Sequence, residues 1–111
     1  MPVPEQIEVL APWEAFGDSS DKRAEVFSAE LASELCPGHV LYGSRARAVA
    51  ARIDRDDVLF EIEGGDTPLV IVHLTWAKES NPRWPVTRFF AGWEQWASEE
   101  MLPAHKEYTC E

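Results

Sequence analysis

The stretch of sequence that decides the fold is residues 45–76, RARAVAARIDRDDVLFEIEGGDTPLVIVHLTW. Apolar residues alternate with other residues in three short runs, which the turn segments 54–57 and 64–68 separate. Alternation with a period of two predicts strands, and turns this short predict antiparallel pairing, because a parallel crossover needs a dozen or more residues. We therefore expect a β-meander over residues 45–76.

The segments on either side of the meander predict helices. In residues 20–36 and 91–102 an apolar residue recurs every three or four positions, which is the spacing of a helix with one apolar face. The expected fold is α+β: an antiparallel meander sheet of three to four strands, with the N-terminal and C-terminal helices packed on one face. A single domain over 1–111 also holds an irregular N-terminal arm over 1–19, a loop over 77–86 and a polar tail over 103–111.

Matching the apolar faces of the strands sets the expected register and the expected outer face. The outer face carries Arg52, Glu61, His73 and Thr75. In this register His73 and Glu61 are diagonal neighbours on adjacent strands. A carboxylate beside an imidazole suits acid–base chemistry, so these two residues are the catalytic candidates. The competing interpretation is a structural ion-pair ladder across the strands.

Trp84 is the candidate binding residue outside the sheet. It lies between Arg83 and Pro85 in the loop over 77–86. An exposed tryptophan beside an arginine has the composition of an interface hot spot. The alternative is that Trp84 folds back as a lid over the end of the sheet, and the sequence leaves both possibilities open.

The strongest signal in the composition is acidity. Twenty acidic residues stand against ten basic ones in 111 residues, for a net charge of −10, and residues 1–44 hold eight acids and two bases. Such a surface repels nucleic-acid phosphates and acidic lipid head groups. It attracts a basic protein partner toward the N-terminal third. No apolar run is long enough for a membrane span and no secretory signal pattern is present, so we expect a cytoplasmic protein.

Cysteine and glycine usage predicts neither a metal nor a cofactor. Cys36 and Cys110 are expected to be free thiols, because a disulfide framework in a small domain normally uses more cysteines. Cys36 and His39 have the spacing of a ligand pair, but no second pair completes a zinc site. Gly64 and Gly65 form a hairpin turn rather than a phosphate-binding loop.

Two short motifs, HLTW at 73–76 and WP at 84–85, resemble a pattern found in a widespread group of small uncharacterised bacterial proteins. The resemblance runs over roughly residues 38–108 and implies a bacterial, single-domain protein. It carries no activity and no functional residues to this chain. Its other segments are HVLYG at 39–43, DDVLF at 56–60, WEQW at 93–96 and MLPAH at 101–105.

These observations favour a non-catalytic protein-binding module, of the inhibitor or immunity type against a basic partner. Its binding residues are expected to be Arg52, Glu61, His73, Thr75 and Trp84. One alternative is a small hydrolase or isomerase that uses His73 and Glu61 as an acid–base pair. Another is a homodimer that covers its outer sheet face by self-association, with Leu59 and Ile71 as buried contacts. The N-terminal arm, His105 and Tyr108 receive no role.

Overall fold

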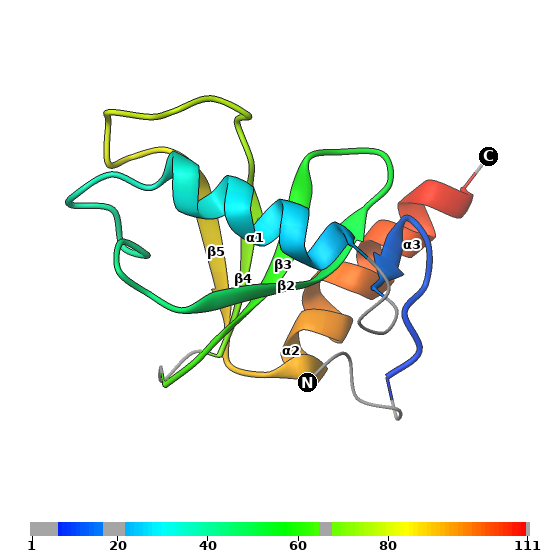
Figure 1. The fold of residues 1–111 in the computed structure, drawn as a ribbon. Coiled ribbons are helices and arrows are strands. Elements are labelled where there is room, and N and C mark those ends of the chain that lie inside the picture. The colour runs from blue at the N-terminus through cyan, green and yellow to red at the C-terminus, as the bar shows by residue number, and fades with distance from the viewer. Residues whose placement is uncertain (1–6, 17–21, 65–67, 111) are drawn as a thin grey trace.

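The computed structural model describes residues 7–16, 22–64 and 68–110. Its centre is one antiparallel sheet whose five strands follow each other in chain order, so that every neighbour in the sequence is also a neighbour in space (Figure 1). The strands are β1 (Trp13–Ala15), β2 (Ala46–Arg52), β3 (Asp57–Ile62), β4 (Leu69–His73) and β5 (Val86–Phe90).

The predicted α+β class and its antiparallel meander are confirmed, and the sheet is larger than expected. β2, β3 and β4 are the three strands of the meander. β1 comes from a segment that we expected to be irregular, whereas residues 87–90 of β5 were expected to be at most a brief edge strand. β1 lies within the N-terminal arm, where buried Trp13 and the hydrogen bond from Ile53 N to Pro12 O hold the chain against β2. β5 begins at Val86, the last residue of the expected loop.

The first helix, α1, spans Arg23–Glu34 and ends two residues earlier than expected. Positions 20 and 21 of the predicted helix lie outside the described residues. Phe27 and Leu31 of its apolar face pack against one core cluster of the sheet, as their helical spacing requires.

The C-terminal helical segment is longer than expected, which corrects the predicted polar tail. It consists of α2 (Trp93–Trp96), the π-helical turn η1 (Ala97–Met101) and α3 (Leu102–Thr109). Pro103 was expected to end or kink this helix. Proline lacks an N–H and its ring crowds the preceding turn, and here it occupies the first turn of α3 directly after a widened π-helical turn. The helix therefore continues through Pro103.

The two helical segments cover opposite faces of the sheet rather than one face, which corrects the expected packing. α1 packs over a cluster that includes Val58, Phe60 and Val70. The C-terminal segment packs over the other face, on Leu59 and Ile71. The physical reason is that the central strands are apolar on both sides, so both faces need a cover. Figure 1 shows α1 on one side of the sheet and α2 and α3 on the other.

The register of the meander differs from the expected one by two residues between β3 and β4. Asp57 pairs with His73 and Glu61 pairs with Leu69. A shift of two residues leaves each side chain on the same face, so the apolar pattern fits both registers equally well. The register between β2 and β3 also differs from the expected one, because Val58 pairs with Ala51 rather than with Ile53. It changes again at a bulge beside Val49, which moves that side chain to the face under the C-terminal helix.

In the part of the chain that the structure describes, no helix has the length and apolarity needed to cross a membrane.

Candidate functional site

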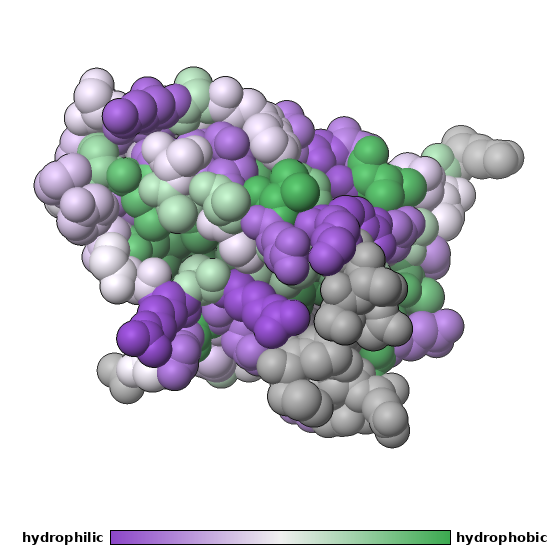
Figure 2. Space-filling model, in the orientation of Figure 1, coloured by the Kyte–Doolittle hydropathy of each residue, from purple (hydrophilic) through white to green (hydrophobic). Residues whose placement is uncertain are grey.

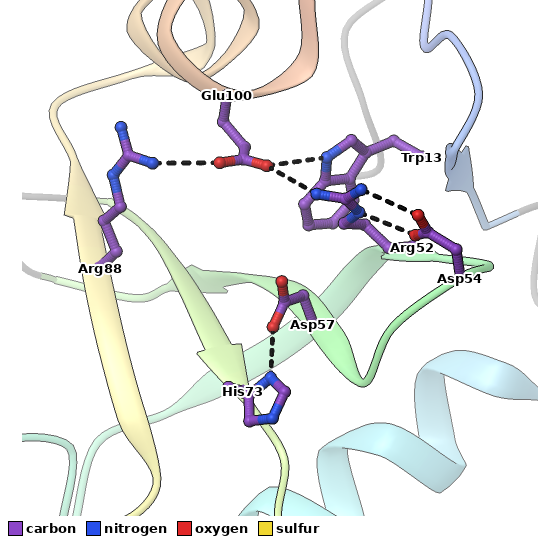
Figure 3. A network of polar contacts seen from close by, with 7 residues as sticks. All are labelled: Trp13, Arg52, Asp54, Asp57, His73, Arg88 and Glu100. Atoms are coloured by element: carbon purple, nitrogen blue, oxygen red, sulfur yellow. Dashed lines mark hydrogen bonds and ion pairs between the residues drawn. The ribbon is translucent and has the colours of Figure 1, made fainter. Parts of the chain in front are cut away.

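Glu100 is the centre of a polar network between the sheet and the C-terminal helix (Figure 3). Arg88 Nη1 on β5 donates to Glu100 Oε1 at 3.0 Å. Arg52 Nη1 on β2 and Trp13 Nε1 on β1 lie 3.5 and 3.4 Å from Glu100 Oε2. One carboxylate of η1 thus ties together three strands that are far apart in the sequence.

Arg52 completes this network with a bidentate ion pair to Asp54. Its Nε and Nη2 atoms donate to the two carboxylate oxygens, both at 2.9 Å. The hydrogen bond raises the pKa of Arg52 above its ordinary value, and the same bond lowers the pKa of Asp54. Only 8% of the Arg52 side chain is exposed. Arg52 therefore acts inside the fold and is not available on an open binding face.

His73 lies on the same side of the sheet but beyond the cover of the helix, with 54% of its side chain exposed. Its Nδ1 atom lies 2.7 Å from Asp57 Oδ1 (Figure 3). Glu61 lies four residues further along β3, on the order of 13 Å from Asp57 along the strand. The expected pair of His73 and Glu61 is therefore not formed, and Asp57 takes the place of Glu61.

Thr75 contacts the opposite helix, α1, through the carboxylate of Glu34. Glu34 Oε1 accepts hydrogen bonds from Thr75 N at 2.9 Å and from Thr75 Oγ1 at 3.1 Å, and Oε2 accepts one from Trp76 N at 2.8 Å. The Glu34 side chain is fully buried. Trp76 has a φ of 58°, in the left-handed region that a tryptophan rarely adopts. Glu34 therefore fixes an unusual turn at the end of β4.

Glu30 forms a second carboxyl group beside Glu34, one helical turn earlier on α1. A hydrogen bond to Glu34, together with burial and the charge of Glu34, raises the pKa of Glu30 from 4.5 to about 7. The sequence interpretation missed both residues. A signal was present, because Glu30 and Glu34 follow Phe27 and Leu31 by three positions and so border the apolar face of the helix.

The buried side chain of His39 connects two loops at one end of the sheet by hydrogen bonds. His39 Nδ1 accepts the amide of Leu41 at 2.9 Å, and Nε2 lies 2.8 Å from the carbonyl oxygen of Pro85, to which it donates. Gly38 has a φ of 98°, and a Cβ atom there would lie 3.3 Å from Pro82. The loop after α1 and the loop before β5 therefore meet in one fixed arrangement.

Large apolar side chains flank this junction and face solvent. Val40 follows His39 and is 65% exposed. Trp84 and Val86 lie on either side of Pro85 and are 45% and 50% exposed. We call these three residues the loop platform. Trp84 therefore does not fold back over the sheet as a lid.

The structure separates the five residues that the sequence placed on one binding surface. Arg52 is held under the C-terminal helix, Thr75 is bonded to α1, and Glu61 borders a hollow at the far end of β3. His73 and Trp84 remain exposed.

The face that was expected to be open, or covered by a second copy, is covered by this chain's own helix. Leu59 and Ile71 are both buried, and they belong to the same core cluster as Trp96 and Met101. They are therefore contacts within the chain rather than contacts of a homodimer.

Both cysteines are free thiols, as expected, with Cys36 partly buried and Cys110 exposed. Among residues 7–16, 22–64 and 68–110, no three histidine, cysteine or carboxylate side chains are grouped so that they could hold a metal ion.

Comparisons of the chain with family models, with curated proteins and with solved structures find no match. The function is therefore inferred from the geometry of the chain alone.

Proposed function

We propose that the chain is a non-catalytic protein-binding module that docks a partner through the loop platform. The observation that carries this proposal is the exposure of Val40, Trp84 and Val86 around one fixed junction. Tryptophan is among the residues most often responsible for binding energy at protein interfaces, and exposed apolar residues that gather at one place mark interaction surfaces.

The way the platform is held supports a role in binding. The buried ring of His39, which bonds to both loops, and the close approach of Pro82 to the position of a Gly38 side chain fix the two loops before any partner arrives. A surface that is already ordered loses less conformational entropy on association, so more of its contact energy appears as affinity. Arg83, next to Trp84, adds a second residue type that is common in interface hot spots.

The charge of the molecule supports a basic partner. A net charge of −10 attracts a positively charged protein over long range and speeds its encounter. The platform then supplies short-range apolar contacts to an apolar pocket on that partner. A small acidic protein with this division of roles suits an inhibitor or immunity protein that neutralises a basic target.

Affinity capture from an extract of the protein's native cells tests the proposal. The bait is the wild-type chain, and Trp84→Ala is the test variant. Tyr108→Ala is the matched control, because Tyr108 is an aromatic residue of similar exposure, 49%, on the distant helix α3. We expect one or more basic proteins to be retained by wild type and by Tyr108→Ala and lost by Trp84→Ala. Identical protein profiles for the three baits would contradict the proposal.

A further inference from the structure

The edge of β2 offers a second interaction surface, separate from the loop platform. β1 pairs only with residues 50–52 of β2. In the part of the chain that the structure describes, no strand pairs with residues 46–48 on that side. Ala48 N donates to Ser28 Oγ of α1 at 3.0 Å instead of to a strand.

The backbone of Ala46 points toward this side. Arg45 O accepts a hydrogen bond from Glu63 N, so the peptide groups of Arg45 face β3. Because successive residues of a strand direct their peptide groups to alternate sides, the N–H and C=O of Ala46 face away from β3. They form one donor and one acceptor in the geometry that an added strand requires.

A trough runs along this edge, between β2 and α1. Two hollows with volumes of about 240 and 340 Å³ form it, and both include Ser28 and Ala46. A third hollow, of about 690 Å³, lies beside the trough over β2 and β3 and has no α1 residue in its lining. Figure 2 shows apolar side chains gathered in the recess beside α1, with strongly hydrophilic residues along its lower rim. We call it the β2 trough, and its principal lining residues are Ser28, Leu31, Leu35, Tyr42, Ser44 and Ala46.

Two positive charges stand on the edge strand of a molecule that is acidic as a whole. Arg45 and Arg47 are exposed, and they line the hollow over β2 and β3. Neither side chain forms a hydrogen bond or ion pair with another described residue, whereas the side chains of Arg52 and Arg88 are paired. Glu61 and Glu63 line the same hollow from β3, one strand further from an added segment, so the two arginines are the charges nearest to that segment.

We propose that β2 accepts, by strand addition, an extended segment of a partner protein in which acidic side chains alternate with small apolar ones. In this mode of recognition the backbone hydrogen bonds provide affinity and alternate side-chain sites provide specificity. Ala46 and Ala48 face α1, and Arg45 and Arg47, which alternate with them, face the other side. A segment with apolar residues toward the trough and acids toward the arginines matches both faces.

A second copy of this chain fits the edge poorly. Pairing of two β2 edges in antiparallel fashion brings Arg45 and Arg47 of one copy near the same residues of the other. Like charges on adjacent strands destabilise pairing, and charged residues on an edge are a common defence against self-association. The same arginines therefore exclude a second copy and a basic segment, while they attract an acidic one.

Titration of the isotope-labelled protein, followed by amide NMR, tests this inference with three synthetic peptides of about seven residues. The first alternates valine and glutamate, the second alternates valine and lysine, and the third is the first with a central proline, which cannot complete the backbone hydrogen bonds. We expect the valine–glutamate peptide to shift the amide signals of Ser28 and residues 44–48. The other two peptides are expected to bind at least about tenfold more weakly.

A charge removal provides the matched variant. Both arginines are exposed, so Arg45→Gln combined with Arg47→Gln is expected to fold and to lose the preference for the valine–glutamate peptide over the valine–lysine one. Arg55→Gln, at an exposed arginine in the turn before β3, is the control and is expected to keep the wild-type preference. Trp84→Ala is expected to bind the peptides as wild type does. Failure of the strand-addition proposal can therefore be distinguished from failure of the loop-platform proposal.

Three results would overturn the inference. One is equal affinity of wild type for the glutamate and lysine peptides, or the absence of binding to all three. Another is a set of shifted signals that lies away from residues 44–48 and Ser28. The last is a change in the amide signals of residues 44–48 with protein concentration in the absence of peptide, which would show that a second copy occupies the edge.

Discussion

Replacing Glu30 with glutamine is expected to remove a pH dependence from the stability of the protein. In the folded chain the hydrogen bond to Glu34 raises the pKa of Glu30 from 4.5 to about 7. Between these two values the folded state keeps the proton while the unfolded state loses it. The folded state then binds more protons than the unfolded state, so the free energy of unfolding falls as the pH rises from 4.5 to 7.

The size of this effect follows from the change in pKa. A rise from 4.5 to about 7 corresponds to an upper limit of about 3 kcal/mol. Glu30 is partly exposed, and solvent screening reduces the contribution of such a group to about 1 kcal/mol. Glutamine has no titrating group but can still donate a hydrogen bond to Glu34. Glu30→Gln should therefore equal wild type near pH 5 and exceed it by about 1 kcal/mol near pH 8.

Urea unfolding at a series of pH values from about 5 to 8, followed by tryptophan fluorescence, measures the difference. Glu25→Gln is the control, because Glu25 lies on the same helix but is exposed and pairs with Lys22. It should retain the wild-type slope. If Glu30→Gln loses stability with rising pH as steeply as wild type does, the shared proton between Glu30 and Glu34 is not the cause and the reasoning fails.

Three further substitutions have expected outcomes that urea unfolding can measure. Glu34→Ala leaves the two backbone amides of Thr75 and Trp76 without their acceptor and should destabilise the protein by about 2–5 kcal/mol; a loss below about 1 kcal/mol would contradict the contacts described. Gly38→Ala adds a Cβ near Pro82 at a positive φ and should cost about 1–2 kcal/mol. His73→Ala removes the contact of an exposed imidazole with Asp57 and should change stability by less than about 1 kcal/mol, and a larger loss would indicate a buried role.

The class of the fold was predictable because the meander obeys local rules. Alternation with a period of two and short turns are properties of neighbouring residues, and they predicted β2, β3 and β4. The helix over Arg23–Glu34 followed from its apolar spacing in the same way.

The arrangement of the layers depended on long-range contacts that the pattern of each element does not contain. Leu59 and Ile71 were left on an open face because both helices were assigned to the other face of the sheet. Trp96 and Met101, which cover Leu59 and Ile71, lie within the helix expected over residues 91–102, so the apolar spacing of that helix did not show which face it covers. The strand over Trp13–Ala15 was missed because so short a segment shows no clear alternation.

The exposure of Trp84 and the face on which His73 lies were predicted from the sequence, but the contact partner of His73 was not. Trp84 is exposed, as the interface interpretation required, and His73 does face away from the α1 side of the sheet. The partner of His73 was misassigned because a slip of two residues preserves every face and exchanges Glu61 for Asp57. The apolar pattern of the sequence is the same in the expected and the observed pairing of β3 with β4, so it could not distinguish them.

Calorimetry tests most directly whether the chain binds its partner through the loop platform. The measurement compares the affinity of the captured partner for the wild-type chain, for Trp84→Ala and for Tyr108→Ala. A central interface tryptophan contributes about 2 kcal/mol or more, which corresponds to a dissociation constant about thirtyfold higher after truncation. We predict that loss for Trp84→Ala and an unchanged constant for Tyr108→Ala. Equal dissociation constants for all three proteins would show that the partner binds elsewhere.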